Sequence, residues 1–584
     1  MVQSTTSPSP TQTSPAPDHT APDHTAPDHP ARTTGLPGLS QAPSVIGRLL
    51  RHAHQVPDRP AIRFEGTITT WAEHCEAVLR TAADLRARGI GPGDRVAVLL
   101  TNRPEFLTVT QATVALGAII VPVNFRLSAG EVAYIVGHSS PRILVSEPKT
   151  HELALGAIAH LRGEAQSDAP GATHAPADGD ATGPTHNEPD VAAHGEAASG
   201  TVDSGPVVLG CEDWLPHVVA HGSALEADDL PVPDAGDDYA ILYTSGTTGR
   251  PKGAVLTHLN LYSGGMQSGA RWQADETRTI MLAPPLFHVG SFMGMHSALV
   301  AGAASLVIPS AGFDAATTLT TMRDNDVTTA FMVPQQWHLI CDEIERNGNE
   351  GLTLSLANWG GAPATPKLLH RMAACLPNAQ ISAVFGQTET SATTVTLTFD
   401  DALRKLGSVG KPTPDTWIRI VDADMNDVGV DEVGEIVYRG TCVMDRYWND
   451  EAATAEAFAG GWFHSGDLVR RDAEGFLYVV DRLKDMIISG GENIYCAEVE
   501  NALSWHPAVA EVTIVGRPDE KWGEVPVACI VPAPGAATPT LQDLRDFLDD
   551  RLARYKHPKD VLVLDALPRT GMGKIHKSAL RQTV

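Results

Sequence analysis

The sequence contains no apolar run of about 18 residues, so no membrane-spanning helix is expected. It also lacks a basic start followed by an apolar stretch, and no secretory signal is therefore expected. Its seven cysteines are scattered and form no Cys-x-x-Cys pair, which argues against a disulfide framework or a zinc site. These absences together favour a cytoplasmic protein with reduced thiols.

Basic residues are scarce, with 43 Lys and Arg against 70 Asp and Glu, and the formal net charge is −27. A chain this acidic is not expected to bind nucleic acid without sequence preference. No Lys or Arg lies between Arg162 and Arg250. Within that stretch, residues 163–205 have little to bury, which predicts a disordered acidic insertion in a surface loop. A partner-binding role for this insertion is the alternative.

Residues 1–40 are rich in Pro, Ser, Thr and Ala and repeat the tripeptide Pro-Asp-His three times. Such a segment has too little apolar surface to offset the entropy lost on ordering, so a disordered tail is predicted. The repeat spaces His19, His24 and His29 evenly, and weak metal binding by these residues is the alternative.

A chain of 584 residues suggests more than one domain. The hydrophobic pattern predicts a strand at 95–100, a helix at 105–116 and a strand at 118–123, and strands alternating with helices predict a parallel α/β sheet. Near the C-terminus, predicted strands at 508–515 and 525–531 and a predicted helix at 541–552 indicate a small α/β domain.

Residues 243–253 read Tyr-Thr-Ser-Gly-Thr-Thr-Gly-Arg-Pro-Lys-Gly between two apolar runs, which predicts a strand, a polar loop and a second strand. Hydroxyl groups and backbone N–H groups beside glycines suit a polyphosphate, and Lys252 adds a positive charge. The loop is not a Walker A loop, because Pro251 precedes Lys252 and a strand rather than a helix is expected to follow.

Residues 244–249 with Pro251-Lys252-Gly253 resemble the signature of the adenylate-forming (ANL) superfamily. Its members include acyl-CoA synthetases, aryl-CoA ligases, adenylation domains of peptide synthetases and beetle luciferases. The resemblance covers roughly residues 45–580 apart from the insertion. Further stretches that resemble family motifs occur in order at 284–290, 359–363, 385–389, 462–467, 481–493 and 568–575.

The resemblance implies a large AMP-binding N-terminal domain with parallel α/β sheets, at residues 41–482. It also implies a small mobile α/β C-terminal domain, at residues 483–584, with a hinge at Lys484. The loop containing Gly490, Gly491 and Glu492 would face the thiol of coenzyme A after the small domain rotates.

Roles for individual residues also follow from the resemblance. Lys574 is expected to be catalytic, while Glu389 and Thr244 are expected to hold Mg²⁺, for which oxygen ligands are suited. Asp467 would accept hydrogen bonds from the ribose hydroxyls. His288, Gly360 and Gly361 would border the acyl substrate. The residues expected to bind ATP are Thr244, Ser245, Gly246, Thr247, Thr248, Gly249, Lys252, Gly361, Ala362, Phe385, Gly386, Gln387, Thr388, Asp467, Arg482 and Lys574.

The resemblance implies an AMP-forming acyl-CoA synthetase, which uses ATP to convert a carboxylate into an acyl-adenylate and then transfers the acyl group to coenzyme A. In activators of α-amino acids an aspartate follows the residue equivalent to Phe287, whereas here it is His288. This argues against an amino-acid substrate. The apolar neighbours, such as Leu286 and Phe292, favour a lipophilic acid, and a medium- or long-chain fatty acid is expected.

Three alternatives stay open: an aryl-acid CoA ligase, an adenylating enzyme that loads a carrier protein, and a catalytically silent nucleotide-binding scaffold. The expected partners are ATP, Mg²⁺, coenzyme A and a small carboxylic acid. A homodimer is compatible with the sequence.

Overall fold

The computed structural model of the protein describes residues 44–163, 205–244, 250–310, 312–569 and 575–584. The predicted tail at 1–40 and nearly all of the predicted insertion at 163–205 lie outside these ranges. Within them, no helix is both long and apolar enough to cross a membrane.

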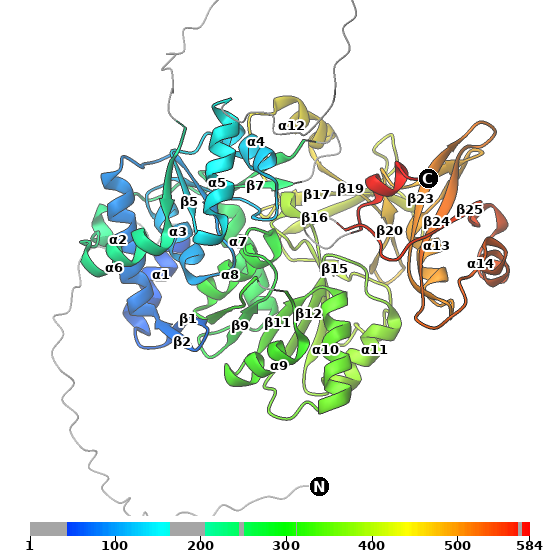
Figure 1. Ribbon diagram of the computed structural model, residues 1–584, viewed down its shortest axis with the longest axis horizontal. Helices are drawn as coiled ribbons and strands as arrows, with labels where there is room; N and C mark the ends of the chain where they lie inside the picture. Colours follow the sequence, from blue (N-terminus) through cyan, green and yellow to red (C-terminus); the bar gives the residue numbers. More distant parts are fainter. Residues whose placement is uncertain (1–43, 164–204, 245–249, 311, 570–574) are drawn as a thin grey trace, which may run out of the picture. The chain divides into compact units, whose positions relative to one another are not determined.

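A nine-stranded sheet is covered by helices on both faces (Figure 1). In strand β9, Ile280 and Leu282 point into one buried core and Met281 into another, as alternation along a strand requires. Helices α7 (His258–Arg271) and α8 (Val289–Ala301) cover the first face. Helices α9 (Ala315–Asp324), α10 (Pro334–Asn347) and α11 (Pro366–Cys375) cover the second. In sheet order the strands are β15 (Lys411–Pro412), β14 (Val395–Leu397), β13 (Gln380–Phe385), β12 (Leu356–Gly360), β11 (Thr329–Met332), β9 (Thr279–Leu282), β10 (Ala304–Val307), β1 (Pro60–Phe64) and β2 (Thr67–Thr70).

A seven-stranded sheet has the same two-sided burial. In strand β3, Ala97 and Leu99 face helices α4 (Ala129–Ser139) and α5 (Pro148–Leu161). Val96 and Val98 face the core that this sheet shares with the nine-stranded sheet. Helices α1 (Val45–Gln55), α2 (Trp71–Ala87), α3 (Pro104–Ala115) and α6 (Cys211–His221) contribute to that shared core. The strands are β18 (Arg446–Tyr447), β8 (Lys252–Thr257), β7 (Asp238–Thr244), β4 (Ile119–Pro122), β3 (Arg95–Leu99), β5 (Ile143–Ser146) and β6 (Val207–Gly210).

Two smaller sheets follow along the chain. The first is antiparallel and contains β16 (Thr416–Val421), β17 (Val433–Gly440), β19 (Phe463–Arg471) and β20 (Leu477–Arg482). The second belongs to the small C-terminal domain and contains β22 (Glu492–Ile494), β21 (Ile487–Ser489), β24 (Gly523–Pro532), β23 (Val509–Asp519) and β25 (Asp560–Val563). Helices α13 (Cys496–Leu503), α14 (Leu541–Leu548) and α15 (Lys577–Arg581) complete this domain.

The predicted α/β class is confirmed, with a large domain of mostly parallel strands and a small C-terminal domain. The predicted elements at 95–100, 105–116 and 118–123 are β3, α3 and β4. The sheets are mixed rather than purely parallel, because β8 pairs antiparallel with both β7 and β18. The predicted helix at 541–552 is wrong at its end: α14 stops at Leu548, its last buried residue, and two aspartates follow where the helix dipole disfavours negative charge.

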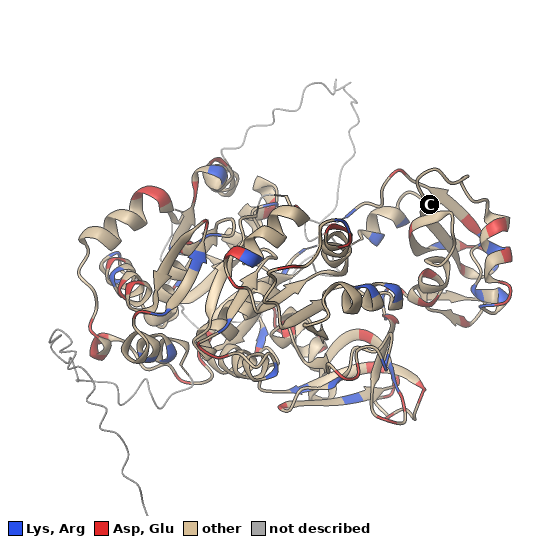
Figure 2. Ribbon diagram, turned by 90° about the horizontal axis from the view of Figure 1, so that it is seen from below, with Lys and Arg blue, Asp and Glu red and all other residues tan. Residues whose placement is uncertain are grey.

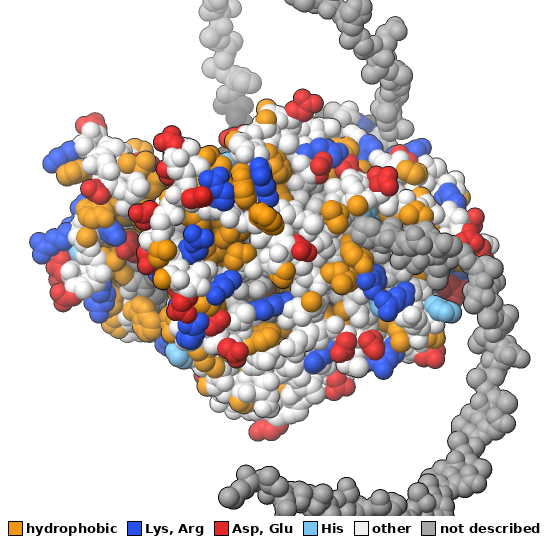
Figure 3. Space-filling view, turned by 180° about the vertical axis from the view of Figure 1, so that it is seen from behind, with side chains coloured by type: hydrophobic (Ala, Val, Ile, Leu, Met, Phe, Trp, Pro, Cys, Tyr) orange, Lys and Arg blue, Asp and Glu red, His pale blue; other side chains and the backbone are white. Residues whose placement is uncertain are grey.

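Acidic and basic residues alternate over the ribbon (Figure 2), and many of them pair across the surface. Arg371, for example, lies 2.6 Å from Asp342 and 2.8 Å from Glu345. Apolar side chains are scattered between charged ones on the face in Figure 3. Exposed ion pairs contribute little to stability, so the buried cores hold the fold together.

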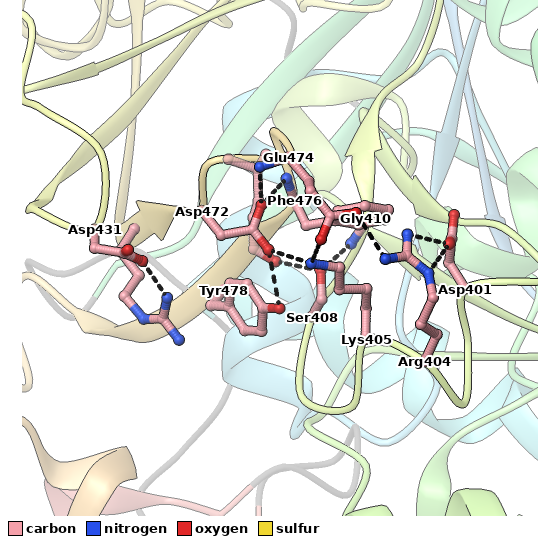
Figure 4. A network of polar contacts seen from close by, with 12 residues as sticks. Asp401, Arg404, Lys405, Ser408, Gly410, Asp431, Asp472, Glu474, Phe476 and Tyr478 are labelled. Atoms are coloured by element: carbon pink, nitrogen blue, oxygen red, sulfur yellow. Dashed lines mark hydrogen bonds and ion pairs between the residues drawn. The ribbon is translucent and has the colours of Figure 1, made fainter.

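A polar network joins the loop after β14 to the hairpin between β19 and β20 (Figure 4). Lys405 Nζ lies 2.8 Å from Asp472 Oδ2 and 2.5 Å from Glu474 Oε1. Arg404 pairs with Glu474 at 2.7 Å and with Asp401 at 2.6 Å. This joint connects the nine-stranded sheet to the antiparallel sheet that carries Asp467 and Arg482.

Replacing Gly410 in this joint is expected to destabilise the protein strongly. Gly410 has a φ of +105°, and an added Cβ would lie 1.9 Å from the carbonyl oxygen of Thr396. Gly410→Ala should therefore lower the free energy of unfolding by more than the ~1 kcal/mol that a positive φ alone costs an alanine. Urea denaturation followed by circular dichroism measures the change.

Gly407→Ala is the matched control, because Gly407 has a φ of +82° with no atom within 4 Å of an added Cβ. Equal losses in the two variants would contradict the steric argument.

Candidate functional site

The end of strand β7 and a short 3₁₀ turn bring the two predicted metal ligands together. Thr244 is the last residue of β7, and Glu389 lies in the turn Thr388–Thr390. The Thr244 hydroxyl donates to Glu389 Oε1 at 3.3 Å. Glu389 is only 8% exposed, so its carboxylate depends on such partners. Two hard oxygen donors side by side suit Mg²⁺.

Tyr447 completes this cluster, and the sequence analysis missed it. Its hydroxyl donates to Glu389 Oε1 at 3.0 Å. Burial and the adjacent carboxylate raise the pKa of Tyr447, so the phenol keeps the proton that it donates. The ammonium of Lys252 lies 5.1 Å from the centre of the Tyr447 ring. The cluster therefore combines a carboxylate, a hydroxyl and a cation at one end of the seven-stranded sheet.

The predicted ATP-binding motif at 385–389 begins at the end of strand β13. Phe385 is half-buried there, and an added Cβ at Gly386 would lie 2.4 Å from the carbonyl oxygen of Ala392. Only glycine fits that close backbone approach. Gln387 Nε2 donates to the carbonyl oxygen of Ser465 at 3.4 Å, which links this segment to strand β19. Thr388 opens the turn that contains Glu389.

The predicted ribose acceptor, Asp467, pairs with Arg482, which is also expected to bind ATP. Asp467 on β19 lies opposite Arg482 on β20 in the strand register. Arg482 Nε is 2.5 Å from Asp467 Oδ1, and the Asp467 side chain is 4% exposed against 42% for Arg482. The buried carboxylate is thus held by a half-exposed guanidinium. A ribose diol would have to share this carboxylate with Arg482.

One aromatic ring that the sequence analysis did not single out, Phe331, lies beside the predicted acyl-site residue Gly360 and beside Gly290. An added Cβ at Gly290 would lie 3.2 Å from Phe331, and one at Gly360 would lie 3.1 Å from it. The half-buried His288 caps helix α8 and accepts at Nδ1 from the Gly290 N–H at 3.2 Å. Phe331 therefore lies between His288 and the end of strand β12.

The motif at 359–363 is a loop only in part, because its first two residues belong to strand β12. The loop itself starts at Gly361, which has a φ of +76° and is exposed, as is Ala362. Gly360 is held in the strand because β12 pairs in parallel with β13 along its whole length.

The predicted hinge lies in a turn between two sheets. Lys484 is exposed and follows strand β20. Gly490 and Gly491 connect β21 to β22 with φ values of +62° and +87°, the signature of a tight two-residue hairpin loop. Glu492 is exposed at the start of β22. The Gly490 N–H donates to the carbonyl oxygen of Trp522 at 2.7 Å, which ties this hairpin to strand β24.

A buried carboxyl group beside this turn is a further feature that the motifs did not reveal. Asp481 is 5% exposed and accepts from the backbone N–H groups of Arg482 at 2.8 Å and Cys496 at 2.5 Å. Burial raises the pKa of Asp481 to about 6 in spite of these bonds. Lys577 pairs with Glu500 at 2.9 Å in the same region.

Five predicted phosphate-loop residues and the predicted catalytic lysine lie outside the described residues. They are Ser245, Gly246, Thr247, Thr248, Gly249 and Lys574.

Asp481→Asn should become more stable relative to the wild type as the pH rises. The native carboxyl titrates near 6, above its ordinary range, so the stability that it contributes is present at low pH and is lost as the pH rises through 6. Between pH 5 and 7.5 the difference in unfolding free energy between the two proteins should shift by about 1 kcal/mol towards the variant. Urea denaturation at both pH values measures this shift.

Asp472→Asn is the control for this pH dependence. Burial would raise the pKa of Asp472, but Lys405 and backbone N–H groups outweigh it and lower the pKa to about 2. The Asp472 carboxyl therefore does not titrate between pH 5 and 7.5. A pH-independent difference for Asp481→Asn would show that the carboxyl is not buried as described.

Comparison with known proteins identifies the family. Residues 49–448 match the family described as "AMP-binding enzyme", and residues 498–574 match "AMP-binding enzyme C-terminal domain". The chain is 35% identical over 543 residues to the indoleacetate–CoA ligase of Aromatoleum aromaticum, covering 91% of this chain and 97% of the relative. It is 32% identical over 545 residues to the long-chain-fatty-acid–CoA ligase FadD13 of Mycobacterium tuberculosis, covering 92% and 98%.

The fold is also similar to that of a solved relative. The O-succinylbenzoate coenzyme A synthetase MenE of Bacillus subtilis, in complex with ATP and magnesium ion, superposes with a TM-score of 0.75 at 30% identity. The match covers 91% of this chain and 98% of MenE. The chain therefore belongs to the AMP-binding enzyme family and is an AMP-forming acid–CoA ligase.

Proposed function

We propose that this protein activates a hydrophobic carboxylic acid with ATP and Mg²⁺ and transfers the acyl group to coenzyme A. The observation that carries the proposal is the cluster of Thr244, Glu389, Tyr447 and Lys252 at the end of strands β7 and β8. This cluster offers oxygen ligands to a metal and a cation to phosphates. The Asp467–Arg482 pair offers the groups that a ribose requires.

In the first step the substrate carboxylate would attack the α-phosphorus of ATP, and pyrophosphate would leave with the bridging oxygen and its electron pair. Lys574 would stabilise the negative charge that develops on the α-phosphate and the carboxylate. Mg²⁺ beside Glu389 and Thr244 would supply further positive charge. Among the described residues, no group of three or more His, Cys, Asp and Glu could hold a metal, so the triphosphate and water would provide the other ligands.

In the second step the small domain would rotate about Lys484, with the domain boundary between residues 482 and 483. The rotation would bring the Gly490–Gly491 hairpin and Glu492 towards the thiol of coenzyme A. The positive φ of both glycines supports a hairpin that is compact enough to approach a ligand. One site would thus perform both steps by a gating motion.

A medium- or long-chain fatty acid is the first candidate for the acid. Helix α8, which His288 caps, is buried through Phe292, Met293 and Met295, and no charged side chain lies between His288 and Ala301. The relative from Mycobacterium tuberculosis carries a long-chain-fatty-acid name. An apolar wall beside the carboxylate site favours a substrate with an apolar body.

An aryl acid is the second candidate, and a specific observation favours it. The cavity beside Phe331 and Gly290 measures only about 10 Å³, and Trp272 also lines it. A flat ring needs less displacement of these side chains than a long chain does. The similar indoleacetate–CoA ligase carries an aryl-acid name.

A panel of carboxylic acids tests the proposal and separates the candidates. AMP release is measured with ATP and Mg²⁺, with and without coenzyme A, for fatty acids of increasing length and for aryl acids. We expect CoA-dependent AMP release with at least one of these two classes. Adenylate formation that coenzyme A cannot discharge would point to a carrier protein as the acceptor, and no turnover with any acid would contradict the proposal.

The variant Phe331→Ala, assayed with the same panel of acids, tests whether Phe331 lines the acyl site. Removing the ring enlarges the space between Gly290 and Gly360, so kcat/KM should shift by about tenfold towards bulkier acids within the preferred class. An unchanged preference would place the acyl group elsewhere.

Tyr447→Phe should weaken the use of Mg²⁺. The substitution removes the hydrogen bond to Glu389 while keeping the ring beside Lys252. A hydrogen bond to a charged group contributes about 1.5–3 kcal/mol, so adenylation should fall by about tenfold or more, and the Mg²⁺ concentration for half-maximal rate should rise. Titration of adenylation with Mg²⁺ measures both effects.

Tyr478→Phe is the matched control, because it removes a 3.3 Å hydrogen bond to Asp472 in the network of Figure 4. It should leave the Mg²⁺ dependence unchanged. The same Mg²⁺ dependence in the wild type and in Tyr447→Phe would remove Tyr447 from the metal site.

A further inference from the structure

A polar cavity lies beside Lys252 and shares only that residue with the site described above. It has a volume of about 180 Å³, far more than the ~10–15 Å³ that one water needs. Helix α4 contributes two aromatic side chains, the segment before β8 and the first residue of β8 each contribute one cation, and the segment after β18 contributes the far wall. Its lining residues are Tyr134, His138, Arg250, Pro251, Lys252, Trp448 and Asp450.

The cavity lies on the opposite face of the seven-stranded sheet from the Glu389 cluster. Consecutive side chains along a strand point to opposite faces. Thr244 and Tyr447 reach Glu389 on one face. Their neighbours Tyr243 and Trp448 pack on the other face, in the core beneath α4. The two residues that flank the phosphate loop, Thr244 and Arg250, therefore lie at the metal cluster and at the cavity, respectively.

Lys252 lies at the boundary between the two faces. Its ammonium is 5.1 Å from the centre of the Tyr447 ring, and its side chain also lines the cavity. Arg250, two residues earlier, places its guanidinium 5.9 Å from the centre of the Tyr134 ring. A group that leaves the metal cluster would thus meet Lys252 first and Arg250 next.

The remaining polar groups suit an anion that carries a metal ion. Burial lowers the pKa of His138, so its ring is neutral near pH 7, and Nδ1 lies 2.8 Å from the Tyr243 hydroxyl. In the tautomer in which Nδ1 accepts from this hydroxyl, the neutral ring carries its proton on Nε2 and can donate it to an anion. Asp450 is the one carboxylate in the lining, and its Oδ1 accepts from the Ala453 N–H at 2.9 Å. Its charge would oppose a bare anion but would suit the hydrated Mg²⁺ of a metal–phosphate complex.

The walls of the cavity are held in place by the backbone. Trp448 donates from Nε1 to the carbonyl oxygen of His138 at 3.2 Å and from its backbone N–H to Gly253 at 2.7 Å. Tyr134 donates to the carbonyl oxygen of Pro251 at 3.2 Å. These hydrogen bonds link α4, β8 and β18, and they therefore fix the backbone that carries Arg250 and Lys252.

Resting on the adenylation proposed above, we propose that this cavity binds a diphosphate group and that the leaving pyrophosphate, with its Mg²⁺, passes into it. Arg250 and Lys252 bind the phosphate oxygens, His138 donates a hydrogen bond, and Asp450 contacts the water shell of Mg²⁺. The product is thereby separated from the acyl-adenylate by the end of the sheet. Coenzyme A also contains a diphosphate, so it is the second ligand that could fill this cavity.

Binding of radiolabelled pyrophosphate to the full-length protein tests the proposal. The catalytic nucleotide site is first saturated with α,β-methylene-ATP and Mg²⁺, so that the positions of the β- and γ-phosphates are filled. Equilibrium dialysis should then show one further pyrophosphate bound per chain. In Arg250→Gln the dissociation constant should rise by at least tenfold, and His138→Phe should also weaken binding.

Arg551→Gln is the matched control, because Arg551 also lies over an aromatic ring, Phe547, but in the small domain. It should bind pyrophosphate as the wild type does, and circular dichroism should show that all variants are folded. Competition with coenzyme A separates the two sources of the diphosphate. Displacement of pyrophosphate by coenzyme A assigns the cavity to the diphosphate of coenzyme A, whereas no displacement assigns it to the leaving pyrophosphate. No binding to the nucleotide-filled protein, or equal affinity in Arg250→Gln, would overturn the proposal.

Discussion

The antiparallel pairing of β7 with β8, which sets Thr244 opposite Lys252, is the constraint on which the candidate site depends. The two strand ends that flank the loop, Thr244 and Lys252, therefore lie at the same end of the sheet. The pairing also requires a glycine at 253, because an added Cβ would lie 2.7 Å from Ile241 and 3.4 Å from the Cβ of Trp448. The β7–β8 hairpin thus positions the Thr244 hydroxyl and the Lys252 ammonium. It also positions β18, the strand that carries Tyr447, because β18 pairs with β8.

Burial of Glu389 explains why three distant segments have to meet there. A carboxylate that is only 8% exposed is costly unless hydrogen bonds replace its water, and Thr244 and Tyr447 supply them. The backbone N–H of Met444 also donates to the Glu389 carbonyl oxygen at 2.7 Å, which fixes the turn to the strand that carries Tyr447. A divalent cation bound there would offset the remaining charge, so stability and function favour the same arrangement.

The motifs predicted the parts of the site that depend on local sequence. Gly386 and the Gly490–Gly491 hairpin each need a backbone conformation or approach that favours glycine, and such needs are visible in a short stretch. Tyr447 and Phe331 could not be found in this way, since their roles arise from contacts between elements far apart in the chain. The same applies to the raised pKa of Asp481, which depends on burial by the whole fold.

The last two residues of strand β20 connect the ribose pair to the small domain. The Arg482 side chain pairs with Asp467 in the antiparallel sheet, whereas Asp481 accepts from the Cys496 N–H at the start of α13. Because neighbouring side chains on a strand point to opposite faces, one strand end can serve both. Any rotation about the proposed hinge at Lys484 would have to break the bond between Asp481 and Cys496 while leaving the Arg482–Asp467 pair intact. The exchange of one hydrogen bond between a carboxyl group and a backbone N–H for water costs about 0.5–3 kcal/mol, so this link can hold one orientation of the small domain without preventing the other.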